Sequence, residues 1–209
     1  MGLFSLLMNK PVMFLLLAIP LLYSVILHEI AHGLVASWFG DDTARYSGRL
    51  TLNPMAHLDP VGTLMLVFIG FGWAKPVPVN YNNLSQARLG VVSVALAGCV
   101  TNILIAMVAL FLMQFQVINM NSALSTILPI VARINIILAA FNLIPIPPLD
   151  GSRILMEFLP RETQPTLARI EPYGFFIIVI LLYTGILYPA IGFIENIIYG
   201  FISIFFGGL

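Results

Sequence analysis

Two histidines and a glutamate stand close together in the stretch His28-Glu29-Ile30-Ala31-His32. On a helix, residues four apart differ by about 40° in direction and about 6 Å along the axis, so both imidazoles can reach one metal ion. A Zn²⁺ ion at this position would acidify a bound water and polarise a substrate carbonyl, and Glu29 would take the proton as general base. The spacing therefore indicates metal-assisted hydrolysis.

The residues around this motif are strongly apolar. Residues 11–27 carry no charge, and the helical pattern continues to about Phe39, where Gly40 and two aspartates follow. An ionisable side chain in the middle of a bilayer costs about 2 to 3 kcal/mol or more unless it has a partner. Three of them in one helical turn favour a metal site, and the alternative is that they only form polar contacts between helices.

A third protein ligand has to come from another part of the chain. A metzincin would have histidine at position 38, which is Trp38, and a thermolysin-like enzyme would use a downstream glutamate, the first of which is Glu157. The remaining candidates carry a carboxylate or an imidazole and are Asp41, Asp42, His57, Asp59 and Asp150.

Asp150 is the favoured ligand among these candidates. It follows Pro145, Pro147 and Pro148 at the end of an apolar stretch, and no continuous helix tolerates these prolines together. The unwound backbone needs a lined cavity, and a carboxylate at this depth needs a partner. The alternative is an ordinary Asp-Gly turn at a helix end, and the incomplete two-histidine site favours the ligand.

The composition is that of a membrane protein. Of the 209 residues, 60% are hydrophobic and 9% charged, whereas a soluble domain has about 25% charged residues. We therefore predict an all-α, multi-pass protein of the cell membrane, with lipid around it and a single domain over residues 1–209. The zero net charge argues against nucleic acid as a partner. The single cysteine, Cys99, excludes an intrachain disulfide and a cysteine-based zinc cluster.

The apolar stretches predict a helical bundle of about four to six membrane segments. The expected spans are residues 11–39, two between 89 and 143 with a polar turn at 114–122, and one or two within 173–209, where Pro189 leaves the number open. Residues 61–71 are too few to cross and suit a re-entrant segment. The expected connecting elements are a short strand at 45–53, a proline-limited extended loop at 72–80 near the metal site, and an interfacial helical stretch at 151–171.

Four motifs resemble those of one known family. HEIAH at 28–32 is similar to its HExxH motif, and NLIPIPPLDG at 142–151 to its N-x-x-P-x-P-x-L-D-G segment. NPMAHLDPVGT at 53–63 and GWAKPVPVN at 72–80 resemble two further stretches of its compact prokaryotic branch. The family is that of the site-2 proteases, the intramembrane zinc peptidases of the M50 type.

The resemblance implies a site and its roles. His28, His32 and Asp150 would hold one catalytic Zn²⁺, Glu29 would be the general base, and Asn142 would steady the oxyanion. His57 would lie near the site, either touching the substrate or transition state or ordering its loop. Asp59 fits a turn or a helix cap. Cys99 stands where the family's L-A-G-P-x-x-N stretch has proline.

The expected function is hydrolysis of peptide bonds in transmembrane protein substrates, as in regulated intramembrane proteolysis. A substrate helix has to unwind before its amides are accessible, and the extended segments near 45–53 and 75–80 are candidates for pairing with it. A zinc transporter would need several polar sites along a path, and a catalytically dead scaffold would not need the general base. Another alternative is a membrane zinc peptidase that cuts soluble or lipidated tails. The sequence gives no oligomeric state.

Overall fold

The computed structural model describes residues 3–70, 72–114, 123–160, 162 and 164–206, and within these ranges it contains helices and no strand. Four helices are long and apolar enough to cross a membrane: α2 (Pro11–Trp38), α5 (Ala87–Gln114), α6 (Ala123–Asn142) and α9 (Leu187–Phe206). The predictions of an all-α polytopic membrane protein and of four to six membrane segments are confirmed.

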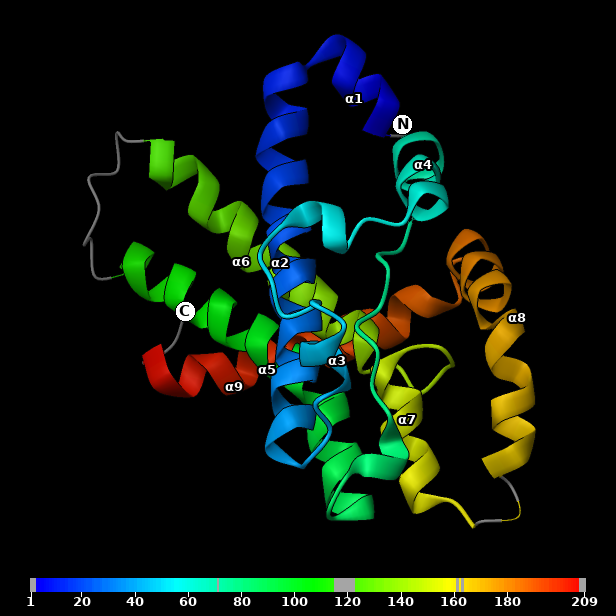
Figure 1. Cartoon of the computed structure of the whole chain (residues 1–209). Helices are drawn as coiled ribbons and strands as arrows, with labels where there is room; N and C mark the ends of the chain where they lie inside the picture. The colour runs from blue at the N-terminus through cyan, green and yellow to red at the C-terminus, as the bar shows by residue number, and fades with distance from the viewer. Residues whose placement is uncertain (1–2, 71, 115–122, 161, 163, 207–209) are drawn as a thin grey trace.

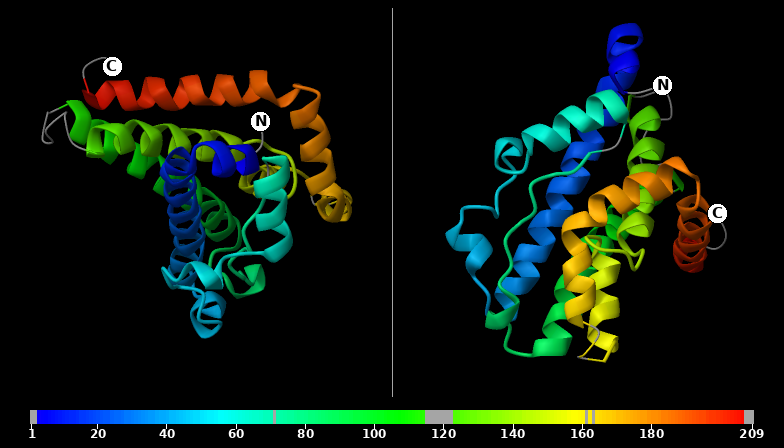
Figure 2. Two further views of the ribbon diagram at one scale, coloured as in Figure 1. Left: turned by 90° about the horizontal axis from the view of Figure 1, so that it is seen from above. Right: turned by 90° about the vertical axis from the view of Figure 1, so that its right-hand side faces the viewer.

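The bundle is built around α5. This helix packs against α2 on one side and α6 on the other, and α9 lies along α6 (Figures 1 and 2). Small side chains let helix backbones approach closely inside a membrane. The buried core shared by α5, α6 and α9 contains Ala106, Ala139 and Ala140. The bundle holds α2, which carries the HEIAH motif, firmly against α5.

Two charged residues within the spans pair with each other. Arg133 of α6 donates to the Glu195 carboxylate of α9 over 2.9 Å, and this pairing lowers the cost of both charges in lipid. The ion pair therefore links α6 to α9.

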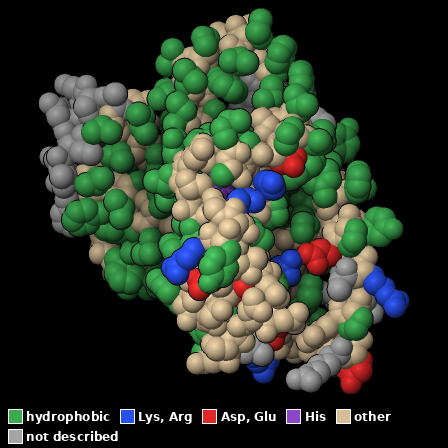
Figure 3. Space-filling model, viewed as in Figure 1, with side chains coloured by type: hydrophobic (Ala, Val, Ile, Leu, Met, Phe, Trp, Pro, Cys, Tyr) green, Lys and Arg blue, Asp and Glu red, His purple; other side chains and the backbone are tan. Residues whose placement is uncertain are grey.

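Other charged side chains gather over the middle and lower part of the face drawn in Figure 3, whereas hydrophobic side chains cover its upper part.

The short helix α4 (Pro60–Ile69) is too short to cross a membrane. Its ten residues rise about 15 Å, half of a hydrocarbon core. The carboxylate of Asp59 caps it by accepting from the Gly62 amide at 2.7 Å, as a cap residue should. Phe68 stacks on Phe4 of α1 (Leu3–Asn9), with the ring centroids 5.4 Å apart. The prediction that this segment is too short for a span is confirmed.

The short strand expected at residues 45–53 is wrong. Helix α3 (Thr43–Tyr46) occupies its beginning, and Gly48 turns the chain with φ +65°, in the left-handed region that favours glycine. Asn53 then caps a single 3₁₀ turn, Pro54–Ala56. Residues 72–80 are extended as predicted, with one isolated bridge between Ala74 and Leu58.

The C-terminal part forms three helices. The interfacial stretch expected at 151–171 divides at Leu159 and Pro160 into α7 (Asp150–Phe158) and α8 (Gln164–Tyr183). The tail then breaks at Gly185, φ +81°, and Pro189 falls in the first turn of α9, where a missing N–H costs little. Of the turn predicted at 114–122, residues 115–122 lie outside the described ranges.

Candidate active site

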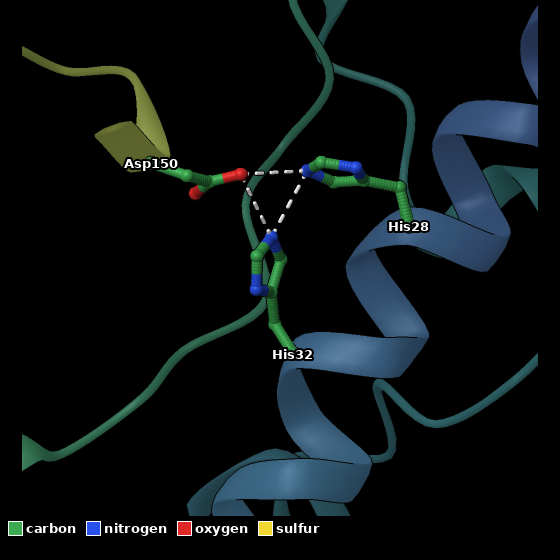
Figure 4. Close-up of side chains that lie close together, drawn as sticks. All are labelled: His28, His32 and Asp150. Carbon is green, nitrogen blue, oxygen red and sulfur yellow. Dashed lines mark hydrogen bonds and ion pairs between the residues drawn. The ribbon is translucent and has the colours of Figure 1, made fainter. Parts of the chain in front are cut away.

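The three side chains of the predicted metal site meet in the structure. His28 and His32 project from one face of α2, and Asp150 reaches them from the first residue of α7 (Figure 4). The Nε2 atoms of the histidines are 2.9 Å apart, and Oδ2 of Asp150 lies 3.0 Å from His28 Nε2 and 3.3 Å from His32 Nε2. Both histidines are buried, and the three ligand atoms lie within 4.8 Å of one another.

The donor set fits zinc. Zinc takes histidine nitrogen and carboxylate oxygen at about 2.0 to 2.2 Å, and a tetrahedral arrangement separates such ligands by about 3.3 Å. The three observed separations of 2.9 to 3.3 Å need to open by only a few tenths of an ångström. Two imidazole nitrogens and one carboxylate oxygen are donors that zinc takes in catalytic sites.

The unwound chain after α6 delivers Asp150 to α2. α6 ends at Asn142, and turns through the proline-rich residues 143–149 lead directly into α7. Gly151 lies so close to the carbonyls of Leu143 and Ile144 that a Cβ at this position would overlap them. The glycine after Asp150 thus allows the loop to fold tightly back on the start of α7.

The ring orientation of each histidine is fixed from behind. His28 Nδ1 lies 2.6 Å from Oδ1 of Asn102, and His32 Nδ1 lies 2.6 Å from the carbonyl oxygen of Val94, both on α5. Each partner is an acceptor, so each Nδ1 carries the proton and each Nε2 presents its lone pair to the centre of the group. Both imidazoles are therefore oriented for metal binding through Nε2.

Gly98 of α5 makes room for the His28 ring. A Cβ on Gly98 would overlap three atoms of that imidazole. We expect Gly98→Ala to displace His28 and to weaken zinc binding by about 10- to 100-fold or more, the loss typical of a disturbed ligand orientation. Zinc titration of the purified protein against a competing chelator measures this change.

Gly192→Ala on α9 is the matched control, because a Cβ there meets nothing within 4 Å. Native zinc affinity in Gly98→Ala would show that the His28 ring does not depend on this space.

Glu29 is held by the extended segment. Its Oε2 accepts from the backbone N–H of Val77 at 2.8 Å. The same segment is fastened further along, because Lys75 N–H donates to His57 O at 2.8 Å and Arg49 donates to Lys75 O at 2.7 Å. The segment runs beside α2 (Figure 2), and the Val77 N–H fixes the carboxylate of the predicted base.

The far end of the extended segment is anchored by Asp41. This fully buried carboxylate accepts from Asn80 N at 2.7 Å, from Asn83 Nδ2 at 2.9 Å, and from Thr43. Burial alone would raise the pKa of Asp41, but the hydrogen bonds from Thr43 and the two asparagines outweigh it and lower the pKa. Asp41 therefore has a structural position, away from the metal group, and the same holds for Asp42, which accepts from Ser37.

The two remaining predicted site residues stand outside the metal group. His57 is fully buried, its Nε2 lies 2.8 Å from the carbonyl oxygen of Thr51, and its Nδ1 has no hydrogen-bond partner within the described residues. The Asn142 side-chain nitrogen donates to Leu138 O at 3.0 Å, which leaves its second N–H for another acceptor. Cys99, in contrast, lies close to the group, with Sγ 3.9 Å from Oδ2 of Asp150.

Sequence reasoning missed the supports behind the ligands. Asn102 stands at the end of the family-like stretch that contains Cys99, and the sequence assigns no role to Asn135 or Ser24. A usable signal was present, because polar side chains in the middle of otherwise apolar spans are costly and need a purpose. Ser24 also stands four residues before His28, on the same helical face.

Comparison with known proteins agrees with this geometry. Residues 113–185, which include Asp150, match the model of peptidase family M50. "Putative zinc metalloprotease YwhC" of Bacillus subtilis is 43% identical over 175 residues, covering 80% of each chain. "Putative zinc metalloprotease Rip2" of Mycolicibacterium smegmatis is 32% identical, covering 82% of this chain and 68% of that protein. "Zinc metalloprotease MJ0392" of Methanocaldococcus jannaschii is 29% identical, covering 74% of this chain and 38% of that protein. No solved structure matches the chain.

Proposed function

The chain belongs to peptidase family M50 and is a membrane zinc metalloprotease, and from this we propose that it is an intramembrane endopeptidase that cuts transmembrane proteins of the cell membrane. One observation carries the proposal: two ligands of the metal group, His28 and His32, lie within α2, a helix long and apolar enough to span a membrane. His32 and His28 stand six and ten residues before the end of α2 at Trp38, or about 9 and 15 Å along its axis. A peptide bond cut there has to enter the depth of the membrane.

We assign the roles as follows, within a single domain over residues 1–209. His28, His32 and Asp150 hold the zinc, which when bound supplies Lewis-acid polarisation and an acidified water. Glu29 accepts the water proton, and its hydrogen bond from Val77 keeps the carboxylate in place to do so. The remaining N–H of Asn142 stabilises charge on the substrate oxygen.

His57 orders the loop that supports the extended segment at residues 72–80. The ring Nε2 of His57 lies 2.8 Å from the carbonyl oxygen of Thr51, and the His57 carbonyl oxygen accepts from the Lys75 N–H. His57 therefore links the loop around Thr51 to the extended segment at residues 72–80. Of the two roles expected for His57, we propose the ordering of its loop.

The extended segment is the proposed contact for an unwound substrate. Residues 45–53 contain no strand that could pair with it, which leaves residues 75–80. Pro76 and Pro78 have no N–H, so this segment would hold substrate amides mainly through its carbonyl groups. A substrate strand bound there would lie beside Glu29, because Val77 touches that side chain.

A reconstitution experiment tests the proposal. The purified protein is placed in liposomes with a reporter that has a transmembrane segment, and in parallel with the same residues in a soluble tail. We expect cleavage of the membrane-embedded reporter alone, its loss after zinc is removed with a chelator, and its return when zinc is added. If the protein cut only the soluble tail, the intramembrane assignment would be refuted. The protein would then be a membrane-bound peptidase that acts outside the membrane.

A further inference from the structure

We propose that Asn135, which touches none of the metal ligands, is a positioning residue that fixes which ring nitrogen of His28 carries the proton. It acts through Asn102, and the two residues are called the asparagine pair below. The inference rests on the proposed ligand role of His28. It concerns zinc affinity, so it can fail while the proteolytic function stands.

The asparagine pair forms a continuous chain of hydrogen bonds across three membrane helices. Asn102 Oδ1 of α5 lies 2.6 Å from His28 Nδ1, and Asn102 Nδ2 donates to Asn135 Oδ1 of α6 at 2.7 Å. Asn135 Nδ2 donates to Ser24 Oγ of α2 and to the backbone carbonyl of Val131, both at 2.8 Å. His28 and Ser24 are buried, and both asparagines are fully buried.

The direction of this chain is set at its far end. A backbone carbonyl can only accept, so the Asn135 atom facing Val131 O must be the nitrogen. Its oxygen then faces Asn102, which must present its own nitrogen there and its oxygen to His28. An oxygen beside Nδ1 requires a proton on Nδ1, and the lone pair of His28 is left on Nε2.

Without Asn135 this direction would depend only on the Ser24 carbonyl oxygen, which Asn102 Nδ2 meets at 3.5 Å, the outer limit of a hydrogen bond. The Asn102 amide could then turn over and offer its nitrogen to His28, which would move the ring proton to Nε2 and block metal binding. Both asparagines are fully buried, so no solvent donor or acceptor reaches them to correct the arrangement. His32 is different, because its Nδ1 faces the carbonyl of Val94, which cannot turn over.

The test is zinc affinity in single and double variants of the full chain, measured by chelator competition. Asn135→Leu keeps a similar shape and should weaken zinc binding by about 10- to 100-fold, as loss of an orienting partner does. Adding Asn102→Asp to that variant should restore most of the affinity, because both carboxylate oxygens are acceptors and neither can present a donor to His28. If Asn135 served packing alone, the double variant should bind zinc more weakly than Asn135→Leu, because a new buried charge damages the packing further.

Ser24→Ala is the matched control. It removes one acceptor of Asn135 but leaves Val131 O, so the direction of the chain and the zinc affinity should stay unchanged. Three results would overturn the proposal: native affinity in Asn135→Leu, no recovery in the double variant, or a loss in Ser24→Ala as large as in Asn135→Leu. If thermal unfolding of the zinc-free protein shows that Asn135→Leu does not fold, the smaller Asn135→Ala replaces it, alone and combined with Asn102→Asp, with the same expected loss and recovery of zinc affinity.

Discussion

Asp150→Ala is expected to release the metal and abolish proteolysis. The carboxylate is the sole contribution of α7 to the metal group, and its Oδ2 lies within 3.3 Å of both histidine nitrogens. Zinc sites of this kind rely on three protein ligands. A residue that merely orients a ligand is worth about 10- to 100-fold in affinity, so removal of a ligand itself should cost more than about 100-fold. Zinc content per chain after purification, together with cleavage of the membrane reporter, measures both effects.

Two further variants sharpen this result. Asp150→Asn keeps the shape but removes the charge, and we expect a clear but smaller loss of zinc. Glu157→Gln removes a carboxylate two turns further along α7, outside the metal group, and should leave the zinc content unchanged. Full zinc occupancy in Asp150→Ala would remove Asp150 from the ligand set.

The main features of the fold and the site were predictable from the sequence because they follow from local chemistry. The absence of charge over residues 11–27 marks a span, and the i, i+4 spacing places His28 and His32 on one face. The prolines after Asn142 break a helix wherever they occur, which put Asp150 at an unwound helix end. That Asp150 meets the histidines followed from the cost of leaving such groups unpaired in a membrane.

The unpredicted features depend on contacts between distant parts of the chain. Nothing local tells that Asn102 and Asn135 point at each other, or that the Arg133 guanidinium reaches Glu195 of α9. The strand expected at 45–53 failed because loose alternation is a weak signal and Gly48 prefers a turn. The division of the tail was ambiguous, since Pro189 suits a first helical turn as well as a break.

Glu29→Gln is expected to abolish cleavage while zinc stays bound. The glutamine side chain has the same length, and its Oε1 can still accept from the Val77 N–H that holds Oε2 of Glu29 at 2.8 Å. The substitution therefore preserves the position of the side chain and removes its ability to take a proton. General base catalysis contributes about 10²- to 10⁴-fold, so the cleavage rate should fall by at least that range at saturating substrate. Cleavage of the liposome reporter, at matched zinc content, gives the measurement.

Zinc content and cleavage rate, measured together, separate the possible roles of Glu29. A loss of kcat with zinc and KM unchanged identifies the proton acceptor, because the affected interaction then arises only during the reaction. If zinc were lost as well, Glu29 would belong to the ligand set or to its support, and native cleavage would exclude it as the base. Asp42→Asn is the matched control: it changes a carboxylate just beyond the end of α2, bonded to Ser37 and outside the metal group, and should leave both readouts at the native level.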